Sequence, residues 1–249
     1  MNTLKGKVAV VTGASKGIGA AIAKAFAEEG AAVVVNYASS REGADRVVAE
    51  IIKKDGRAIA VQGDVSKEED VKRLFAETKK AFGAADVLVN NAGVFAFQPI
   101  AEITAKEYRR EFDTNVLGTI LTIQEAVKHF GEKGGSVINV SSAGSTNPPV
   151  GSTVYMATKG AVDVVTMALA KELAPRKIRV NTLAPGATLT EGAKELGIED
   201  ADFGKAIIAA TPLGRIGQPE DIANAAVFLA SENSSWLTGE RIVAAGGWR

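Results

Sequence analysis

The sequence contains no cysteine and a single histidine, His129. Without cysteine, the chain can form no disulfide, no thiolate nucleophile and no cysteine-based zinc site. One histidine argues against a histidine-based metal site, and we predict no metal. His129 also lies near the end of a predicted helix, where an imidazole suits the helix dipole, so we assign it no catalytic role. Any chemistry must therefore rest on other side chains.

An excess of charge of one sign is also missing, because 29 Lys and Arg residues balance 29 Asp and Glu residues. A nucleic-acid-binding domain is usually visibly basic, so this class is disfavoured. No stretch of 18 apolar residues occurs, which argues against a transmembrane helix. Residues 1–7 carry no apolar segment typical of a secretory signal. We expect a cytoplasmic protein.

Short apolar runs alternate with longer amphipathic stretches along the chain. The runs lie at 8–11, 32–35, 58–61, 87–89, 136–140, 178–182 and 241–244. Short runs rich in β-branched residues predict strands buried on both faces, and strands that alternate with helices predict a parallel sheet. Right-handed crossovers would place helices on both faces. Because no linker or internal repeat interrupts the 249 residues, we predict one α/β domain, residues 1–249, with a doubly wound, mostly parallel, seven-stranded sheet.

A glycine-rich turn at residues 12–19 joins the first predicted strand to the first helix. Gly13 can adopt backbone angles that other residues avoid, Gly17 lets the backbone approach a pyrophosphate, and Gly19 lets the helix pack on the strand. The helix N-terminus offers free N–H groups to phosphate. The Gly-x3-Gly-x-Gly spacing lacks the Gly-Lys-Ser/Thr ending of a nucleotide triphosphatase loop. In this position the turn predicts a dinucleotide site, and a plain tight βα turn is the alternative.

The end of the second predicted strand should select the dinucleotide. An acidic residue there would bind the ribose 2′-hydroxyl of NAD. Instead, the sequence after Val35 reads Asn-Tyr-Ala-Ser-Ser-Arg, with no acid before Glu42. Hydroxyls and cations suit a 2′-phosphate. We therefore predict a preference for NADP(H), with NAD(H) still possible; the alternative is that Lys16 and Arg41 are merely exposed charges.

Tyr155 and Lys159 open a predicted helix that runs to Leu173. Their i, i+4 spacing places both side chains on one helix face. A neighbouring ammonium favours the phenolate and so lowers the pKa of a tyrosine, which makes the phenol a competent general acid or base. The pair is a candidate proton-transfer site, although most Tyr-x3-Lys pairs are surface residues.

Taken together, these residues resemble the short-chain dehydrogenase/reductase family over essentially the whole chain. The matching motifs occur in order and at family spacing: Thr12-Gly13-x3-Gly17-x-Gly19, Asp64-Val65, Asn90-Asn91-Ala92-Gly93, Asn115, Ser142, Tyr155-x3-Lys159 and Pro185-Gly186. The sequence looks most like 3-oxoacyl-carrier-protein reductases and the similar glucose dehydrogenases and broad carbonyl reductases. The resemblance implies a Rossmann fold and an NAD(P)-dependent oxidoreductase that acts on a CH–OH or C=O group.

The resemblance also implies roles for individual residues. Tyr155 would protonate the carbonyl oxygen during reduction, and Lys159 would hold the nicotinamide ribose and lower the pKa of Tyr155. Ser142 would bind the substrate oxygen, and Asn115 would anchor a proton-relaying water. Asp64 would bind the adenine, and Asn91 would line the ribose. The implied cofactor site comprises Gly13, Ser15, Lys16, Gly17, Ile18, Gly19, Tyr37, Ser39, Ser40, Arg41, Asp64, Val65, Asn91, Ala92, Gly93, Tyr155, Lys159, Pro185, Gly186, Thr188 and Thr190.

Several of these residues have simpler explanations. Asp64 could be a helix N-cap, residues 90–93 a turn that ends the fourth strand, and Asn115 a structural polar group inside a helix. One position departs from the family, because Ala245 stands where an Asp often precedes the final Gly-Gly pair. No catalytic residue is affected, but the family's subunit packing at that end is put in doubt.

The substrate pocket is expected to be apolar, with Phe95, Phe97 and Val150 in its lining and a lid over residues 187–211. The two phenylalanines could equally belong to the core. We predict NADPH-dependent reduction of a ketone, either a 3-oxoacyl thioester or another carbonyl. The alternatives are a glucose or alcohol dehydrogenase and a non-catalytic NADP(H)-binding sensor or scaffold.

The resemblance also suggests two kinds of protein partner. Lys133 and Arg176 take the positions of two arginines that dock the acidic acyl-carrier protein in its reductases, and such residues should lie near the pocket mouth. Family members usually form tetramers through two long helices, which here are residues 105–130 and 153–173. We predict a homotetramer, with a dimer as the alternative.

Overall fold

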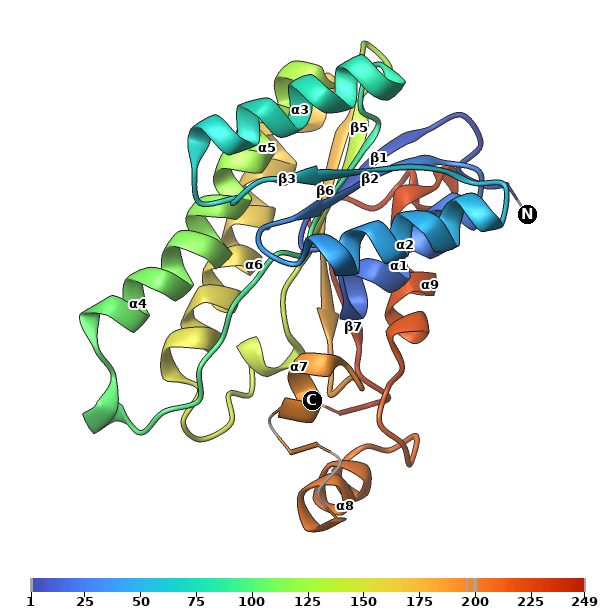
Figure 1. Ribbon diagram of the computed structural model, residues 1–249. Coiled ribbons are helices and arrows are strands. Elements are labelled where there is room, and N and C mark those ends of the chain that lie inside the picture. The colour runs from blue at the N-terminus through green and yellow to red at the C-terminus, as the bar shows by residue number, and fades with distance from the viewer. Residues whose placement is uncertain (1, 196, 199–200, 249) are drawn as a thin grey trace.

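A seven-stranded sheet forms the centre of the protein in a computed structural model that describes residues 2–195, 197–198 and 201–248 (Figure 1). The strands are β1 (Val8–Val11), β2 (Ala32–Tyr37), β3 (Arg57–Gln62), β4 (Val87–Asn90), β5 (Gly135–Val140), β6 (Ile178–Pro185) and β7 (Arg241–Ala244). They lie in the order β3-β2-β1-β4-β5-β6-β7, and every neighbouring pair is parallel. The predicted fold class is confirmed, with a sheet that is wholly parallel.

Helices cover both faces of this sheet (Figure 1). One face carries α1 (Gly17–Glu28), α2 (Arg41–Lys53) and α9 (Pro219–Ala230), and the other carries α3 (Glu68–Phe82), α5 (Gly118–His129) and α6 (Thr153–Leu173). Each layer has its own apolar cluster, with Phe26 in the first and Phe75 in the second. All residues of β1, β2 and β4 are buried, which is why these strands are mostly apolar, with Asn36 and Asn90 as the polar exceptions.

The predicted helix over residues 105–130 is interrupted. α4 (Ala105–Phe112) leads into a π-helical turn, η2 (Asp113–Leu117), before α5 begins. π-Helical turns are rare and occur frequently at functional sites. Asn115 lies in this turn. Shorter 3-10 turns are η1 (Ile100–Glu102), η3 (Ala143–Ser145), η4 (Ala174–Arg176) and η5 (Glu232–Ser234).

The strand order reverses next to β1, with β2 and β3 on one side and β4 to β7 on the other. In doubly wound sheets, ligands bind outside the carboxyl ends of the strands at this switch point. The glycine turn and residues 91–93 both lie at this edge. In the predicted lid, α7 (Glu191–Glu195) and α8 (Ala201–Ala210) follow β6, and residues 196 and 199–200 of the lid lie outside the described residues.

Two further observations concern the described part of the chain. None of its helices combines the length and the apolar character needed to span a bilayer. Within the same residues, no group of three or more His, Asp or Glu side chains is arranged to hold a metal ion.

Candidate active site

The glycine turn and the segment after β4 are joined into one unit. The Thr12 hydroxyl accepts the backbone N–H groups of Asn91 and Ala92, both at 3.0 Å, and Asn91 Nδ2 donates to the carbonyl oxygens of Thr12 and Gly13. Gly13 has a φ of +60°, and a β-carbon there would lie 2.7 Å from Ala92 Cα. A β-carbon at Gly19 would collide with the Asn91 side chain. Glycine is therefore required at both positions.

The N-terminus of α1 is open to an anion. Lys16 occupies the N-cap position without a capping hydrogen bond from its side chain, and the first turn has no acidic residue. Free N–H groups and the helix dipole favour a negative charge here. Ser15 and Ile18 are half-buried in the same turn. Thr190 approaches from the segment after β6, since a β-carbon at Gly17 would lie 3.4 Å from Thr190 Cβ. These features fit a dinucleotide pyrophosphate.

The residues predicted to bind a 2′-phosphate gather beside this turn. Lys16, Ser39, Ser40 and Arg41 are exposed, whereas Tyr37 is buried at the end of β2. Gly43 allows the start of α2 to lie against the glycine turn, because a β-carbon there would lie 2.7 Å from the Ser15 carbonyl oxygen and 2.8 Å from Ser40 Oγ. Arg41 Nε lies 3.4 Å from Asp45 Oδ2, an exposed ion pair of little energetic weight.

Asn36 and Gly43 were missed by sequence reasoning. Asn36 is buried, accepts the Gly13 N–H at 3.3 Å, and donates to the carbonyl oxygens of Val61 and Gly63. It therefore ties the glycine turn to β2 and β3. A polar residue in an apolar strand run could have signalled this role, because a buried amide needs partners. No comparable signal marks Gly43.

Asp64 and Val65 follow β3. Asp64 Oδ1 accepts the backbone N–H of Ser66 at 3.0 Å and its hydroxyl at 2.7 Å. The N-cap of α3 is Lys67, so Asp64 closes a turn and does not cap the helix. Val65 packs on Gly118, where a β-carbon would lie 2.6 Å from Val65 Cγ2. The adenine-binding role of Asp64 and Val65 stays a prediction.

The segment after β6 forms the other end of the predicted cofactor site. Pro185 ends β6, and the Gly186 N–H donates to the Ala244 carbonyl oxygen at 3.0 Å. A β-carbon at Gly186 would lie 2.7 Å from Ala245 Cβ, so Ala245 contacts a predicted cofactor residue directly. The Thr188 hydroxyl donates to the Gly186 carbonyl oxygen at 2.9 Å.

Tyr155 and Lys159 lie on the first turns of α6. Lys159 Nζ lies 5.6 Å from the centre of the Tyr155 ring and donates to the Val140 carbonyl oxygen at 2.9 Å. Gly93 lies close to the same ammonium, because a β-carbon there would lie 3.6 Å from Lys159 Nζ and 3.3 Å from Asn115 Oδ1. The fold therefore brings Gly93, Asn115 and the Tyr–Lys pair together.

The π-helical turn presents Asn115 to the segment after β4. Asn115 Oδ1 accepts the Val94 N–H and Asn115 Nδ2 donates to the Val94 carbonyl oxygen, both at 2.8 Å. Asn115 Nδ2 also donates to Thr158 Oγ1 at 3.0 Å. These bonds confirm that Asn115 is a structural polar group, which was the simpler explanation given for it above. The water-anchoring role stays a prediction.

Burial and charge determine the ionisation of the Tyr–Lys pair. Burial, reinforced by the charge of Glu111, raises the pKa of Tyr155 to about 12. Burial lowers the pKa of Lys159 to about 8, against the opposing charge of Asp163. The sequence predicted that Lys159 would lower the pKa of Tyr155, whereas desolvation and the charge of Glu111 raise it here. At neutral pH the phenol is therefore protonated, as a general acid requires.

The two serines after β5 have different environments. Ser141 is buried and donates to the Lys159 carbonyl oxygen at 3.1 Å. Ser142 is half-buried, and its hydroxyl accepts the Gly144 N–H at 3.1 Å at the start of η3. Because Ser141 is bound to the backbone of α6, the predicted choice of Ser142 as the substrate-facing serine is compatible with the structure.

Two phenylalanines lie against Tyr155. The ring centres of Phe95 and Phe97 lie 5.7 Å and 6.3 Å from that of Tyr155. Helix α7, in the predicted lid, reaches the same cluster, since a β-carbon at Gly192 would lie 3.3 Å from Phe95 Cζ. Phe95 and Phe97 thus form an aromatic wall beside the tyrosine. Val150, also predicted to line the pocket, is fully exposed and does not pack in this wall.

Lys133 and Arg176 lie at the opposite end of the sheet. They precede β5 and β6 and so mark the amino ends of these strands, whereas Tyr155 lies near the start of α6, beyond the carboxyl end of β5. The 21 residues of α6 span about 30 Å. Neither basic residue is therefore at the pocket mouth of its own subunit, contrary to expectation.

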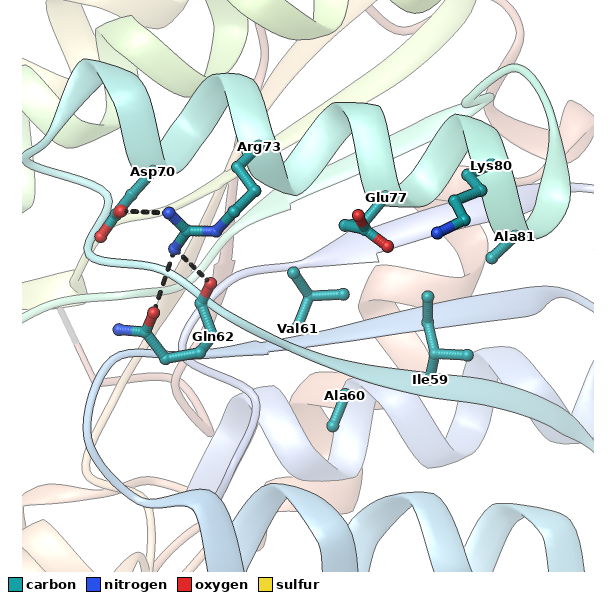
Figure 2. A pocket seen from close by; sticks show the side chains of 9 residues that line it. All are labelled: Ile59, Ala60, Val61, Gln62, Asp70, Arg73, Glu77, Lys80 and Ala81. Carbon is teal, nitrogen blue, oxygen red and sulfur yellow. Dashed lines mark hydrogen bonds and ion pairs between the residues drawn. The ribbon is translucent and has the colours of Figure 1, made fainter.

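A hollow of about 690 Å³ lies between β3 and α3, away from this site (Figure 2). In it, Arg73 donates to Asp70 Oδ1 at 2.8 Å and to Gln62 Oε1 at 3.0 Å. Figure 2 shows both bonds near one end of the hollow. Because β3 is the edge strand and β5 lies four positions along the sheet, the hollow is remote from Tyr155. No predicted catalytic or cofactor residue lines it.

Comparison with known proteins agrees with this geometry. The family model described as enoyl-(acyl carrier protein) reductase matches residues 13–249. The chain is 55% identical to an uncharacterized oxidoreductase of Methylorubrum extorquens, over 100% of both chains. It is 34% identical to a solved angucycline C-6 ketoreductase with bound NADP, covering 98% of this chain and 96% of that one, with a TM-score of 0.92. It is 35% identical to a short chain dehydrogenase from Burkholderia cenocepacia in complex with NADP, covering 98% of each chain, with a TM-score of 0.93.

Proposed function

The chain belongs to the short-chain dehydrogenase/reductase family, whose members are NAD(P)-dependent oxidoreductases, and we propose that it reduces ketones to secondary alcohols with NADPH. The observation that carries the proposal is the arrangement around Tyr155. Lys159 lies on the same helix face, the aromatic wall lies against the phenol, and the glycine turn opens at the same edge of the sheet. A relative with NADP bound, which shares this fold, is a ketoreductase.

NADPH is supported by the residues around the glycine turn. The pyrophosphate would bind the N-terminus of α1, and the 2′-phosphate would bind Lys16, Ser39, Ser40 and Arg41, which are exposed beside it. No acidic residue follows β2 before Glu42 to favour the free 2′-hydroxyl of NAD. When bound, the dinucleotide supplies the hydride.

The chain's own residues supply the proton and the positioning. Tyr155 Oη donates its proton to the carbonyl oxygen as the carbonyl carbon accepts a hydride, which leaves a secondary alcohol and a phenolate. Burial makes this phenolate unfavourable. The positive charge of the nearby Lys159 ammonium stabilises it. Ser142 donates a hydrogen bond to the same substrate oxygen. A proton from solvent then restores the phenol, and Asn115 would hold the relaying water.

The aromatic wall favours an apolar ketone over a polyol, because Phe95 and Phe97 offer no hydrogen bonds to sugar hydroxyls. This disfavours the glucose dehydrogenase alternative. Within one subunit, Lys133 and Arg176 lie away from the pocket, and this favours a free carbonyl compound over a 3-oxoacyl chain carried by a protein. We therefore expect a broad carbonyl reductase.

The test is to follow NADPH and NADH oxidation with an aryl ketone, an acetoacetate ester and an acetoacetyl thioester. NADPH should be consumed faster, with the aryl ketone and the ester among the accepted substrates. Tyr155→Phe should lose at least about 100-fold in kcat and still bind NADPH. Full activity in this variant would remove Tyr155 from the proposed role. NADPH binding without turnover of any carbonyl, or of glucose with NADP⁺, would instead indicate a sensor or scaffold.

A further inference from the structure

An ion pair joins the last strand to the catalytic helix. Arg241, the first residue of β7, places Nε 3.1 Å from Asp163 Oδ2 on α6. Both side chains are largely buried, so the pair is screened less by salt than a surface pair. The reaction proposed above makes no use of this pair.

The same guanidinium holds the segment that contains Ser142. Arg241 Nη2 donates to the Ser142 carbonyl oxygen at 2.8 Å, to the Ala143 carbonyl oxygen at 3.3 Å and to Ser145 Oγ at 3.0 Å. The Ser145 hydroxyl donates to Asp163 Oδ2 at 2.6 Å. Residues 142–145 are therefore held by β7 and by α6 at once. A planar guanidinium presents its donors in a fixed fork, which a lysine cannot reproduce.

Asp163 also lies one helical turn beyond Lys159, which lies one turn beyond Tyr155. The three side chains therefore share one face of α6. The charge of Asp163 opposes the burial that lowers the pKa of Lys159. Asp163 Oδ1 is buried and has no hydrogen-bond partner among the described residues. The other charges facing this row are Arg241, beside Asp163, and Glu111, which faces Tyr155.

We propose that Arg241 and Asp163 act together as positioning residues. Arg241 fixes the Ser142 segment beside Tyr155. Asp163 anchors Arg241 and also keeps the Lys159 ammonium charged. The inference rests on the proposed ketone reduction, in which Ser142 and Lys159 act. Ser142 lies between a strand and a single 3-10 turn, so contacts from other elements must orient it. A displacement of about 1 Å at such a group can cost about 100-fold in rate.

Three substitutions separate the two roles. Arg241→Gln removes both the charge and the fork, so kcat should fall at least about tenfold while the NADPH dissociation constant, measured by fluorescence titration, stays unchanged. Arg241→Lys keeps the charge and loses the fork, so it should lose kcat with a wild-type pH profile. Asp163→Asn releases Arg241 and should lower kcat to a similar extent.

The alkaline limb of the pH profile provides a readout that a purely structural role would not move. Asp163→Asn removes a negative charge that opposes deprotonation of Lys159, so the limb should move to lower pH. Arg241→Gln removes a positive charge beside the same site, so the limb should move to higher pH. Shifts in the same direction, or none in folded variants, would contradict the role assigned to Asp163.

Hydrogen exchange of the NADPH-bound protein tests positioning without reference to activity. Amides in residues 142–146 should exchange faster in Arg241→Gln and Arg241→Lys than in the wild type. Unchanged exchange would overturn the positioning role, whether or not the enzyme turns over. A wild-type protein that reduces no carbonyl would overturn only the proposed function, whereas an active protein with indifferent Arg241 variants would overturn only this inference.

The matched control is an exposed ion pair between the ends of α1 and α2. Lys54 Nζ lies 2.6 Å from Glu28 Oε1 there, remote from residues 142–145. Glu28→Gln and Lys54→Gln should leave kcat, the pH profile and the exchange pattern unchanged. Thermal unfolding of every variant shows whether the protein is folded before its kinetics are compared.

Discussion

Glu111 is a buried acid beside the proposed catalytic tyrosine, with only 1% of its surface exposed. Its Oε1 accepts the Ala96 N–H at 3.0 Å, between the two phenylalanines of the aromatic wall. Its Oε2 is buried without a hydrogen-bond partner in the described residues. Burial, reinforced by Glu107, raises the pKa of Glu111 to about 7. One side chain thus supports the wall and acts on the ionisation of Tyr155.

Glu111→Gln should lower the pKa of Tyr155, because it removes a negative charge that opposes the phenolate and keeps an oxygen that can accept the Ala96 N–H. Ultraviolet titration of tyrosinate absorbance measures the effect, with Tyr155→Phe identifying the contribution of this residue. An unchanged midpoint would show that the carboxylate does not act on the phenol.

The same substitution should change how stability depends on pH. A carboxyl with a raised pKa binds its proton more tightly in the folded state, so its contribution to stability is complete below its unfolded value of 4.5 and is lost as pH rises to about 7. Glu111→Gln should therefore unfold a few degrees above the wild type at pH 8, with the gap closing near pH 4.5. The exposed Glu102→Gln serves as the control; equal gaps at both pH values would contradict the assignment.

Lys16 and Arg41 test the cofactor preference. If both bind the 2′-phosphate, replacing them with alanine should raise the KM for NADPH at least about tenfold, because hydrogen bonds to charged groups contribute about 1.5–3 kcal/mol each. The KM for NADH should change little. The control is Lys24→Ala, because Lys24 lies within α1 and pairs with Glu50. An equal rise in KM for both cofactors would mean that Lys16 and Arg41 do not bind the 2′-phosphate.

At the scale of elements, the π-helical turn determines how the active site is joined to the sheet. Asn115 binds both backbone groups of Val94 and also Thr158, which lies in the sequence between the proposed catalytic residues Tyr155 and Lys159. The resemblance to the family led us to expect one long helix over residues 105–130. A π-helical turn widens a helix by one residue, and the pattern of residue types does not reveal this. The partners of the side chain that the turn redirects come from segments packed against the helix.

Asn115→Ala should leave the Val94 N–H and carbonyl oxygen without protein partners. We expect a loss of about 2 kcal/mol or more in the free energy of unfolding, measured with urea, together with a lower kcat. Thr114→Ala, in the same turn, should cost less. If the two variants were equally stable, the bonds to Val94 would not be the link between this turn and the site.

At the scale of the whole molecule, exposed apolar residues mark a surface on the outer helices. Ile120 on α5 and Val164 and Met167 on α6 are all exposed, and these helices pack in one layer (Figure 1). Large apolar side chains exposed on one helix layer are candidates for an interface. They are compatible with the predicted homotetramer, which uses the helices over residues 105–130 and 153–173.

Light scattering after size exclusion should give four times the mass of one chain. The double substitution Val164→Glu and Met167→Glu should reduce the assembly to dimers or monomers, because a buried charge at the interface lacks a partner. Ile52→Glu, at an exposed apolar residue on α2, should leave the tetramer intact. A monomeric wild-type protein would contradict the prediction.

The sequence by itself determined the strands, the parallel sheet, the glycine turn and the Tyr155–Lys159 pair. Each depends on local spacing or on a run of residue types, and parallel strands bring their carboxyl ends to one edge wherever helices connect them. The steric roles of Gly13 and Gly19 were predicted from local sequence too, because a tight turn next to a helix imposes its own steric limits.

Only the tertiary structure decided which charges surround the site. Glu111, Asp163 and Arg241 come from a helix, a second helix and the last strand, and nothing in their local sequence connects them. The same holds for the direction of the Tyr155 pKa. Spacing predicted the nearby ammonium, but the burial and the Glu111 charge that raise this pKa are properties of the packed molecule. Desolvation and long-range contacts depend on where distant segments meet, and that is settled only when the helices pack on the sheet.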